Sequence, residues 1–169
     1  MSELRRKGAF LACLVVLGAC ACACGKAAKS EAAATLEPKE ETVYGYAMHL
    51  PHGAAMRIET TTPGEPSSRV FTAEGLTIEV RVADRDGPLM VRTLDQAVTS
   101  IPPAGMARPM ERVELSPHEY LVVTAPAVGM NDVWVWRQGT TRFARARCLG
   151  PDTKLARLKE ICSSLRAID

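Results

Sequence analysis

Residues 76–83 read LTIEVRVA and alternate apolar with polar side chains. The four aliphatic residues at the even positions would lie on one face of a strand, while Thr77, Glu79 and Arg81 would lie on the other. The sequence DGP at 86–88 then predicts a turn that ends the strand. One apolar and one polar face is typical of an antiparallel strand that covers a core on one side.

Turn residues on both sides of this strand separate further stretches that favour extended structure. We expect earlier strands at 43–50, 56–61 and 69–73. We expect two later hairpins, one formed by 108–115 and 119–125 and the other by 133–137 and 141–149. The chain therefore carries strands both before and after residues 76–83.

Two helices are expected among and after these strands. Thr93 is a suitable N-cap for a first helix that the two prolines at 102–103 end. A second helix is expected at 153–167, with an apolar stripe that comprises Leu155, Leu158, Ile161, Cys162 and Leu165. This order predicts an α+β fold, an antiparallel sheet of about six to seven strands with one helix between the strand groups and a C-terminal helix packed on it.

The first twenty residues have the pattern of an export signal. Basic residues at 5–7 precede an apolar run at 8–17, and that run is much shorter than the roughly 20 residues that span a bilayer. The sequence LGAC at 17–20 resembles the lipobox of bacterial lipoproteins. The resemblance implies a lipid-modified Cys20, carrying acyl chains such as palmitate, and Cys24 is the alternative site.

This interpretation divides the chain into three parts. Residues 1–19 would be a signal peptide, 20–42 the lipidated cysteine with a flexible tether, and 43–169 a single α+β domain. Acyl chains on one cysteine suffice for stable membrane anchoring. We therefore expect a lipid-anchored protein of the bacterial cell envelope. Ala21 after the cysteine resembles the sorting signal that favours the outer membrane over the inner one.

The charge of the chain argues against nucleic acid as a partner. Cleavage before Cys20 would remove three of the 21 basic residues and one of the 19 acidic residues, which leaves a formally neutral chain. Nucleic-acid-binding domains usually carry a clustered basic surface.

A family resemblance covers about residues 45–168. The sequence GYAMHLP at 45–51, the order of elements and the C-x13-C spacing of Cys148 and Cys162 resemble the PsbP/Mog1-like α/β/α sandwich of many small bacterial lipoproteins. The resemblance implies a protein that binds a partner. Known members bind partners as different as photosystem subunits and a small GTPase, and no binding residue carries over to this chain.

Cys148 and Cys162 are the two cysteines of the expected domain. Cys148 shares a strand face with Ala144 and Ala146, and Cys162 lies on the apolar stripe of the last helix. In an exported protein we expect them to form a disulfide, which would join the last strand to the last helix. The alternative is two free buried thiols.

Histidine, methionine and cysteine clusters were considered as metal ligands. Met48, His49, His52 and Met56 are close in sequence but include no fixed third ligand, so we interpret them as exposed turn histidines and core methionines. The same holds for His118 in its Pro-His turn. The alternate cysteines at 20, 22 and 24 lack the spacing of structural zinc sites. We expect neither a metal nor another cofactor.

The sequence lacks the motifs that mark common classes of enzyme. The sequence contains no Gly-x-Ser-x-Gly elbow, His-Glu-x-x-His pair or phosphate-binding loop. Its acidic residues are scattered over turns and polar strand faces, so nothing selects a general acid and base. We therefore do not expect an enzyme.

Trp134 and Trp136 alternate with Val133 and Val135, so the tryptophans would share one strand face. If that face is exposed, they are candidate partner-binding residues; if a helix covers it, they belong to a core. The predicted function is that of a non-catalytic, lipid-anchored envelope protein that binds or scaffolds another envelope protein. The alternative is a carrier of a small apolar ligand, such as a lipid or pigment.

Overall fold

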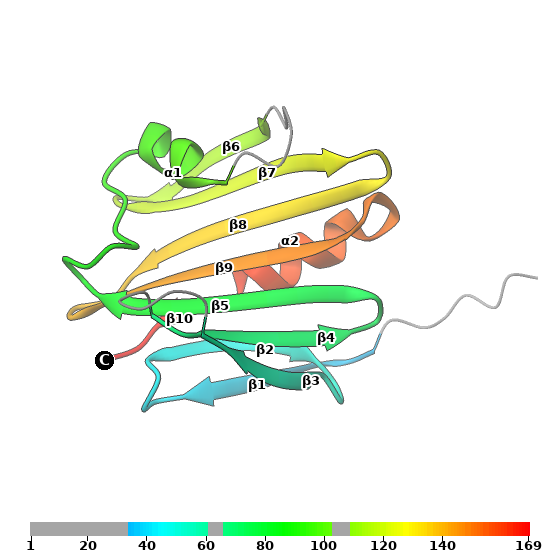
Figure 1. Cartoon of the computed structure of the whole chain (residues 1–169), viewed down its shortest axis with the longest axis horizontal. Coiled ribbons are helices and arrows are strands. Elements are labelled where there is room, and N and C mark those ends of the chain that lie inside the picture. The colour runs from blue at the N-terminus through cyan, green and yellow to red at the C-terminus, as the bar shows by residue number, and fades with distance from the viewer. Residues whose placement is uncertain (1–33, 61–65, 103–108) are drawn as a thin grey trace, which may run out of the picture. The chain divides into compact units, whose positions relative to one another are not determined.

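Seven antiparallel strands form the main sheet of the computed structural model, which describes residues 34–60, 66–102 and 109–169 (Figure 1). Its order is β3-β4-β5-β9-β8-β7-β6. The strands are β3 (Ala55–Glu59), β4 (Ser68–Ala73), β5 (Leu76–Asp84), β6 (Pro109–Ser116), β7 (Glu119–Ala127), β8 (Met130–Gln138) and β9 (Arg142–Pro151). All described residues belong to one unit, Ala32–Asp169.

A second, three-stranded sheet has the order β1-β2-β10. Its strands are β1 (Leu36–Glu41), β2 (Tyr46–Pro51) and β10 (Arg166–Ala167). The helical elements are α1 (Leu94–Ser100), the short 3-10 helix η1 (Asp152–Lys154) and α2 (Leu155–Ser163). The predicted α+β class is confirmed, with an antiparallel sheet, one helix between the strand groups and one C-terminal helix.

The burial of alternate residues in β5, predicted from the sequence, is confirmed. Its four aliphatic residues are buried, whereas the residues between them are partly exposed. The buried side joins a first core, which the sheet shares with α2 and β2. Leu158, Ile161, Cys162 and Leu165 of the predicted stripe are all buried there. In Figure 1, α2 lies behind β8 and β9, on the side away from the viewer.

A second core lies on the opposite face of the sheet, and it contains both tryptophans. Trp134 and Trp136 are only 2% and 0% exposed, and their rings stack with centroids 6.1 Å apart. Val91, Ala97 of α1 and the residues around them pack over these rings. Of the two alternatives for the tryptophans, the structure supports the buried one, because α1 and the segment before it cover this face. Trp134 and Trp136 are therefore not an exposed partner-binding surface.

Helix α1 begins where the sequence predicts. The Thr93 hydroxyl oxygen accepts a hydrogen bond from the Gln96 backbone N–H at 3.2 Å. The Gln96 side-chain oxygen accepts one from the Arg92 backbone N–H at 2.7 Å. This arrangement resembles a capping box and fixes the direction in which the preceding segment enters the helix.

The C-terminal helix is shorter than expected. It ends at Ser163, and Arg166 and Ala167 then pair with Ala47 and Tyr46 of β2. The predicted disulfide is present: Cys148 of β9 is bonded to Cys162 of α2, with Cα atoms 6.0 Å apart. The crosslink joins the helix to the sheet within the first core.

The N-terminal boundary of the folded unit also differs from the expected one. Residues 36–41, placed in the tether by their polar composition, form β1, which pairs with β2 from Leu36–Pro51 to Glu41–Tyr46. Leu36 packs against the first core. The remaining predicted features of residues 1–33, including Cys20, Cys22 and Cys24, lie outside the described residues, as do residues 61, 103 and 108 at the ends of predicted elements.

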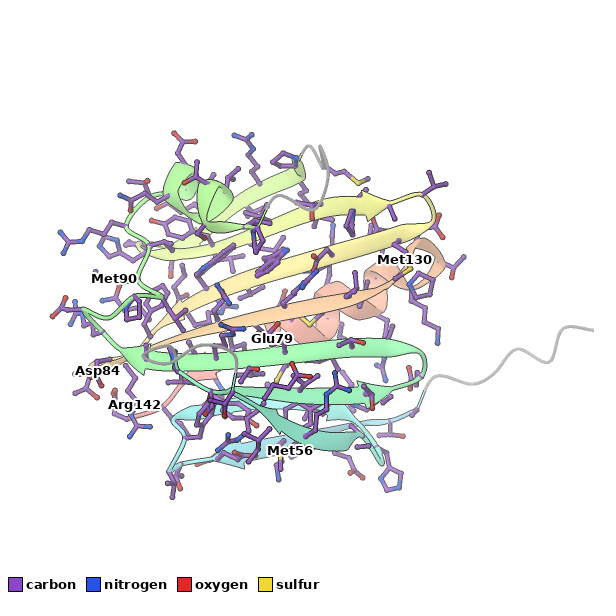
Figure 2. All side chains as sticks on the ribbon, in the orientation of Figure 1. Met56, Glu79, Asp84, Met90, Met130 and Arg142 are labelled. Atoms are coloured by element: carbon purple, nitrogen blue, oxygen red, sulfur yellow. A yellow bond between two sulfur atoms is a disulfide. The ribbon has the colours of Figure 1, made fainter. Side chains whose placement is uncertain are left out.

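Across the described ranges, no helix combines the length and apolar character required to cross a membrane. Several loops lie at the end of the main sheet where β5 finishes. Figure 2 shows Asp84 at the end of β5 and Met90 in the following loop, at the same end of the sheet. A cleft opens at this end of the sheet.

Candidate functional site

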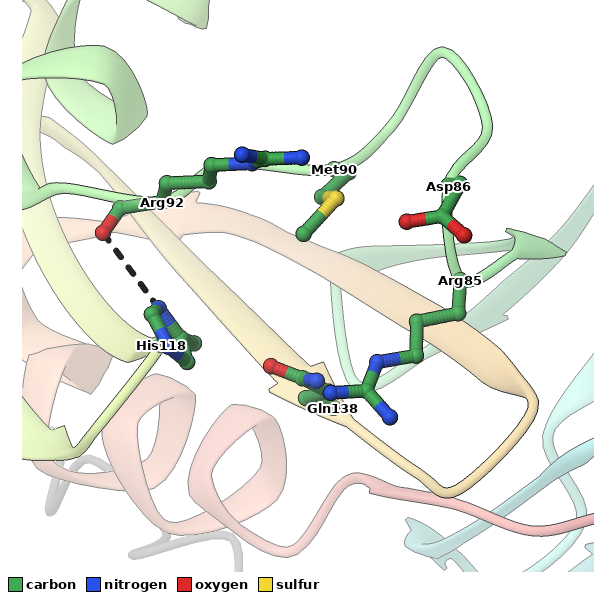
Figure 3. A pocket seen from close by; sticks show the side chains of 6 residues that line it. All are labelled: Arg85, Asp86, Met90, Arg92, His118 and Gln138. Carbon is green, nitrogen blue, oxygen red and sulfur yellow. Dashed lines mark hydrogen bonds between the residues drawn. The ribbon is translucent and has the colours of Figure 1, made fainter.

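A cleft of about 350 Å³ opens at this end of the seven-stranded sheet (Figure 3). It is formed by the loop after β5, the segment before α1, the β6–β7 turn and the end of β8. These segments meet because, in an antiparallel sheet, the end of one strand and the start of the next lie at the same end of the sheet. The lining residues are Arg85, Asp86, Met90, Arg92, His118 and Gln138.

The β6–β7 turn presents His118 at the cleft. Pro117 and His118 form the two-residue connection between Ser116 and Glu119. His118 has a φ of 66°, in the left-handed region that a side chain rarely adopts. Non-glycine residues held in this region often lie at functional sites. Its Nδ1 atom faces the Arg92 carbonyl oxygen at 3.4 Å.

Three hydrogen bonds made by Tyr120 and Glu119 hold this turn in place. The Tyr120 hydroxyl donates a hydrogen bond to the same Arg92 carbonyl oxygen at 2.7 Å. The Glu119 carboxylate accepts one from Ser116 at 2.6 Å and one from Arg137 at 2.8 Å. Burial alone would raise the pKa of Glu119, but these hydrogen bonds hold it below its usual value. Glu119 therefore stays ionised and anchors the turn to β8.

The two arginines of the cleft differ in the hydrogen-bond partners of their guanidinium groups. The Gln138 amide oxygen is turned toward Arg85. It accepts two hydrogen bonds from the Arg85 guanidinium, at 2.7 Å each. Arg85 also donates to the Thr140 carbonyl oxygen at 3.3 Å. The Arg92 guanidinium is exposed and has no hydrogen bond or ion pair with any residue in the described ranges. Arg92 is thus a charged group available to a ligand.

A carboxylate already occupies the hollow next to this cleft. That hollow shares Arg85, His118 and Gln138 with the cleft. There the Asp169 carboxylate accepts hydrogen bonds from the backbone N–H groups of Thr140 at 3.0 Å and Thr141 at 2.7 Å. These bonds, led by the one from the Thr141 backbone, lower the pKa of Asp169 below its usual value. The β8–β9 turn is therefore an anion-binding element.

Charged residues also lie on the sheet face beside the second core, where they pair with one another. Glu79 and Arg81 form an ion pair at 2.5 Å within β5. Asp132 is 2% exposed and contacts Arg147 at 2.8 Å. Burial raises the pKa of Asp132, and its hydrogen bonds with Arg147 only partly offset this. This group of charges is an internal network rather than a ligand site.

The residues considered as metal ligands lie apart from the cleft, except His118. Met48 is buried, but Met56 is 48% exposed, so its interpretation as a core methionine is wrong. Met56 lies on β3, the end strand of the main sheet, and its side chain is outside both cores. The His52 ring contacts Glu37 at 2.7 Å. Within the described ranges, no three His, Cys, Asp or Glu side chains cluster as metal ligands would.

Sequence reasoning missed Arg85, Arg92 and Gln138. It identified the turns around them, at 86–88 and 117–118, but no spacing connects residues that come from four separate segments. The charged lining gives an apolar ligand little to contact in this cleft. The structure therefore does not favour the apolar-ligand carrier.

No protein-family model and no curated protein matches the sequence. A similar solved structure is the solution structure of cyanobacterial PsbP (CyanoP) from Synechocystis sp. PCC 6803. The TM-score is 0.55 at 12% identity, and the match covers 82% of this chain and 95% of that chain. The chain therefore has a PsbP-like fold, as the order of its elements predicted.

Proposed function

We propose that this chain is a non-catalytic, lipid-anchored envelope protein that binds an acidic segment of a neighbouring envelope protein. The observation that carries the proposal is the carboxylate of Asp169, held by two backbone N–H groups beside the cleft. This edge of the sheet thus already has the chemistry of carboxylate recognition. The similarity to cyanobacterial PsbP supports a fold suited to this role.

The free groups of the cleft match such a ligand. Arg92 can form paired hydrogen bonds to a carboxylate, and such charge-assisted bonds are about twice as strong as neutral ones. His118 lines the same cleft and adds a polar imidazole ring to it. The contact between His118 Nδ1 and the Arg92 carbonyl oxygen holds the ring at the cleft, where a ligand can reach it.

Binding of a short peptide tests the proposal. The probe is a fluorescent hexaglutamate peptide, with hexaglutamine as the uncharged comparison. Arg92→Ala is expected to weaken hexaglutamate binding about tenfold, because it removes a charge-assisted contact. His118→Ala is expected to weaken it less, about threefold at neutral pH.

Arg112→Ala is the matched control, because Arg112 is also an exposed arginine, 3.9 Å from Asp95 and outside the cleft lining. It should leave the affinity within about twofold, by the usual small effect of exposed pairs. Equal weakening by Arg92→Ala and Arg112→Ala would show attraction to net charge alone. That result, or equal binding of hexaglutamine, would contradict the assigned cleft.

A further inference from the structure

The first strand of the main sheet has a free edge. β3 pairs with β4 on one side and is the end strand in the sheet order. Ala55 to Ile58 are all exposed. Met56 and Ile58 are 48% and 58% exposed, and Figure 2 shows Met56 at this margin of the ribbon. An exposed edge with apolar side chains is a template for pairing with another strand.

The other free edges carry features that prevent such pairing. β6 begins with Pro109 and has two register irregularities against β7. β1 contains Pro38 followed by three charged residues, Lys39 to Glu41. β3 contains no proline, and its pairing with β4 is continuous from Ala55 to Glu59. Prolines, bulges and short length are common protections of edge strands, and the edge strand β10 has only two residues. Among the described strands, β3 is therefore the edge left open.

We propose that β3 pairs in antiparallel fashion with β3 of a second copy of this chain, in a register centred on Ile58. This register places Ile58 opposite Ile58 of the second copy. It also places Arg57 opposite Glu59 of the second copy, and the reverse, so two opposite-charge pairs form on one face of the sheet and the Ile58 pair on the other. Cross-strand pairs of these kinds stabilise antiparallel sheets.

The charges favour the register centred on Ile58 over the one centred on Arg57. A register centred on Arg57 would place two arginines directly opposite each other, and like charges in that position are destabilising. In the single chain, Arg57 and Glu59 already contact each other at 2.6 Å along the strand. Pairing would exchange this exposed contact for two contacts across the interface. The same patch serves both copies, as a twofold contact requires.

This inference goes beyond the proposed function and does not depend on it. The cleft is lined from the ends of β5 and β8, the β6–β7 turn and the segment before α1. None of the residues in the proposed pairing contributes to that lining. Loss of self-pairing should therefore leave hexaglutamate binding unchanged.

Charge reversal tests the pairing. Full-length chains in a non-ionic detergent are compared by sedimentation equilibrium over a range of concentrations. The wild type should show a monomer–dimer equilibrium. Arg57→Glu and Glu59→Arg should each raise the dimer dissociation constant about tenfold, because each replaces two attractive pairs with two repulsive ones. The side chains are 60% and 41% exposed, so neither change should disturb the fold.

Two further samples make the test specific for the register. An equimolar mixture of the two single variants should restore the dimer, because every facing pair is again of opposite charge. The double variant R57E/E59R should also recover to within about threefold of the wild type. Failure of both to recover, or a wild type that stays monomeric at all concentrations, would overturn the proposal.

Crosslinking provides a check that does not depend on affinity. Ile58→Cys should form an intermolecular disulfide on mild oxidation, because directly opposed Cβ atoms are only about 5 Å apart. Val128→Cys is the control, since Val128 is fully exposed in the β7–β8 turn. Equal crosslinking of the two variants would contradict a contact at β3.

Discussion

Individual residues show how far alternation along a strand predicts burial. Val133 and Val135 face the first core and the tryptophans face the second, so all four side chains are buried. The sequence predicts correctly that these pairs face opposite ways. It does not predict that both faces are covered, because the cover comes from residues 89–101, more than thirty positions earlier.

Replacing Trp134 with alanine should therefore destabilise the fold rather than merely remove a contact surface. We expect the free energy of unfolding to fall by about 3–5 kcal/mol, the usual cost of deleting a buried tryptophan. Urea denaturation measures this. Val128→Ala is the control at a fully exposed site, where the change should stay within about 0.5 kcal/mol. A stable Trp134→Ala variant would place the ring outside the core.

Among the elements, the crosslink between β9 and α2 is the feature that depends most on packing. The helix is only nine residues long, and helices of this length are marginal in isolation. Burial of Leu158 and Ile161 against the sheet holds one side of it. The disulfide then fixes its last turn to the middle of the first core.

Breaking this disulfide should lower stability without changing the fold. The bond closes a loop between residues 14 apart in sequence, which is worth about 3 kcal/mol. For a domain of this size, that corresponds to a fall in Tm of roughly 10 °C. Calorimetry of reduced wild type and of C148A/C162A measures it. Reagent-accessible thiols at both positions in the native, oxidised protein would contradict the bond.

The elements also show why part of the structure could not be predicted. The strands from β2 to β9 and both helices follow local patterns of alternation, helical spacing and turn residues. β1 and β10 have no such pattern: β1 is mostly charged and pairs with the adjacent β2, whereas β10 is set by pairing with β2 far away in sequence. The cleft is a further case, because Arg85 and Arg92 reach it only through the arrangement of the whole sheet edge.

For the whole molecule, the anchoring cysteine belongs to the proposed function. The proposed tether would be shorter than expected, because residues 36–41 form β1 and belong to the folded unit. About fifteen residues then separate Cys20 from the first strand. A coil of that length has a mean span of roughly 20 Å, so the proposed anchor would keep the unit close to its membrane.

Cysteine replacement tests which residue carries the lipid. Cys20→Ser should leave the chain as an unlipidated precursor, because LGAC at 17–20 would lose its modified residue. Cys24→Ser should be processed and acylated like the wild type, and so serves as the control. Mass spectrometry of the N-terminal peptide measures both. An acylated Cys24 at the N-terminus would contradict the assignment to Cys20.

The small sheet has a consequence for how the chain acquires its structure. β2 lies between β1, the first strand, and β10, the last, so Tyr46 must pair with Ala167. Contacts between such distant positions are slow to form, because a long loop must close before they add any stability. A chain emerging from its N-terminus can form its hairpins early, but it cannot complete this sheet until Arg166 and Ala167 are free to pair with β2. The small sheet is therefore completed after the hairpins of the main sheet.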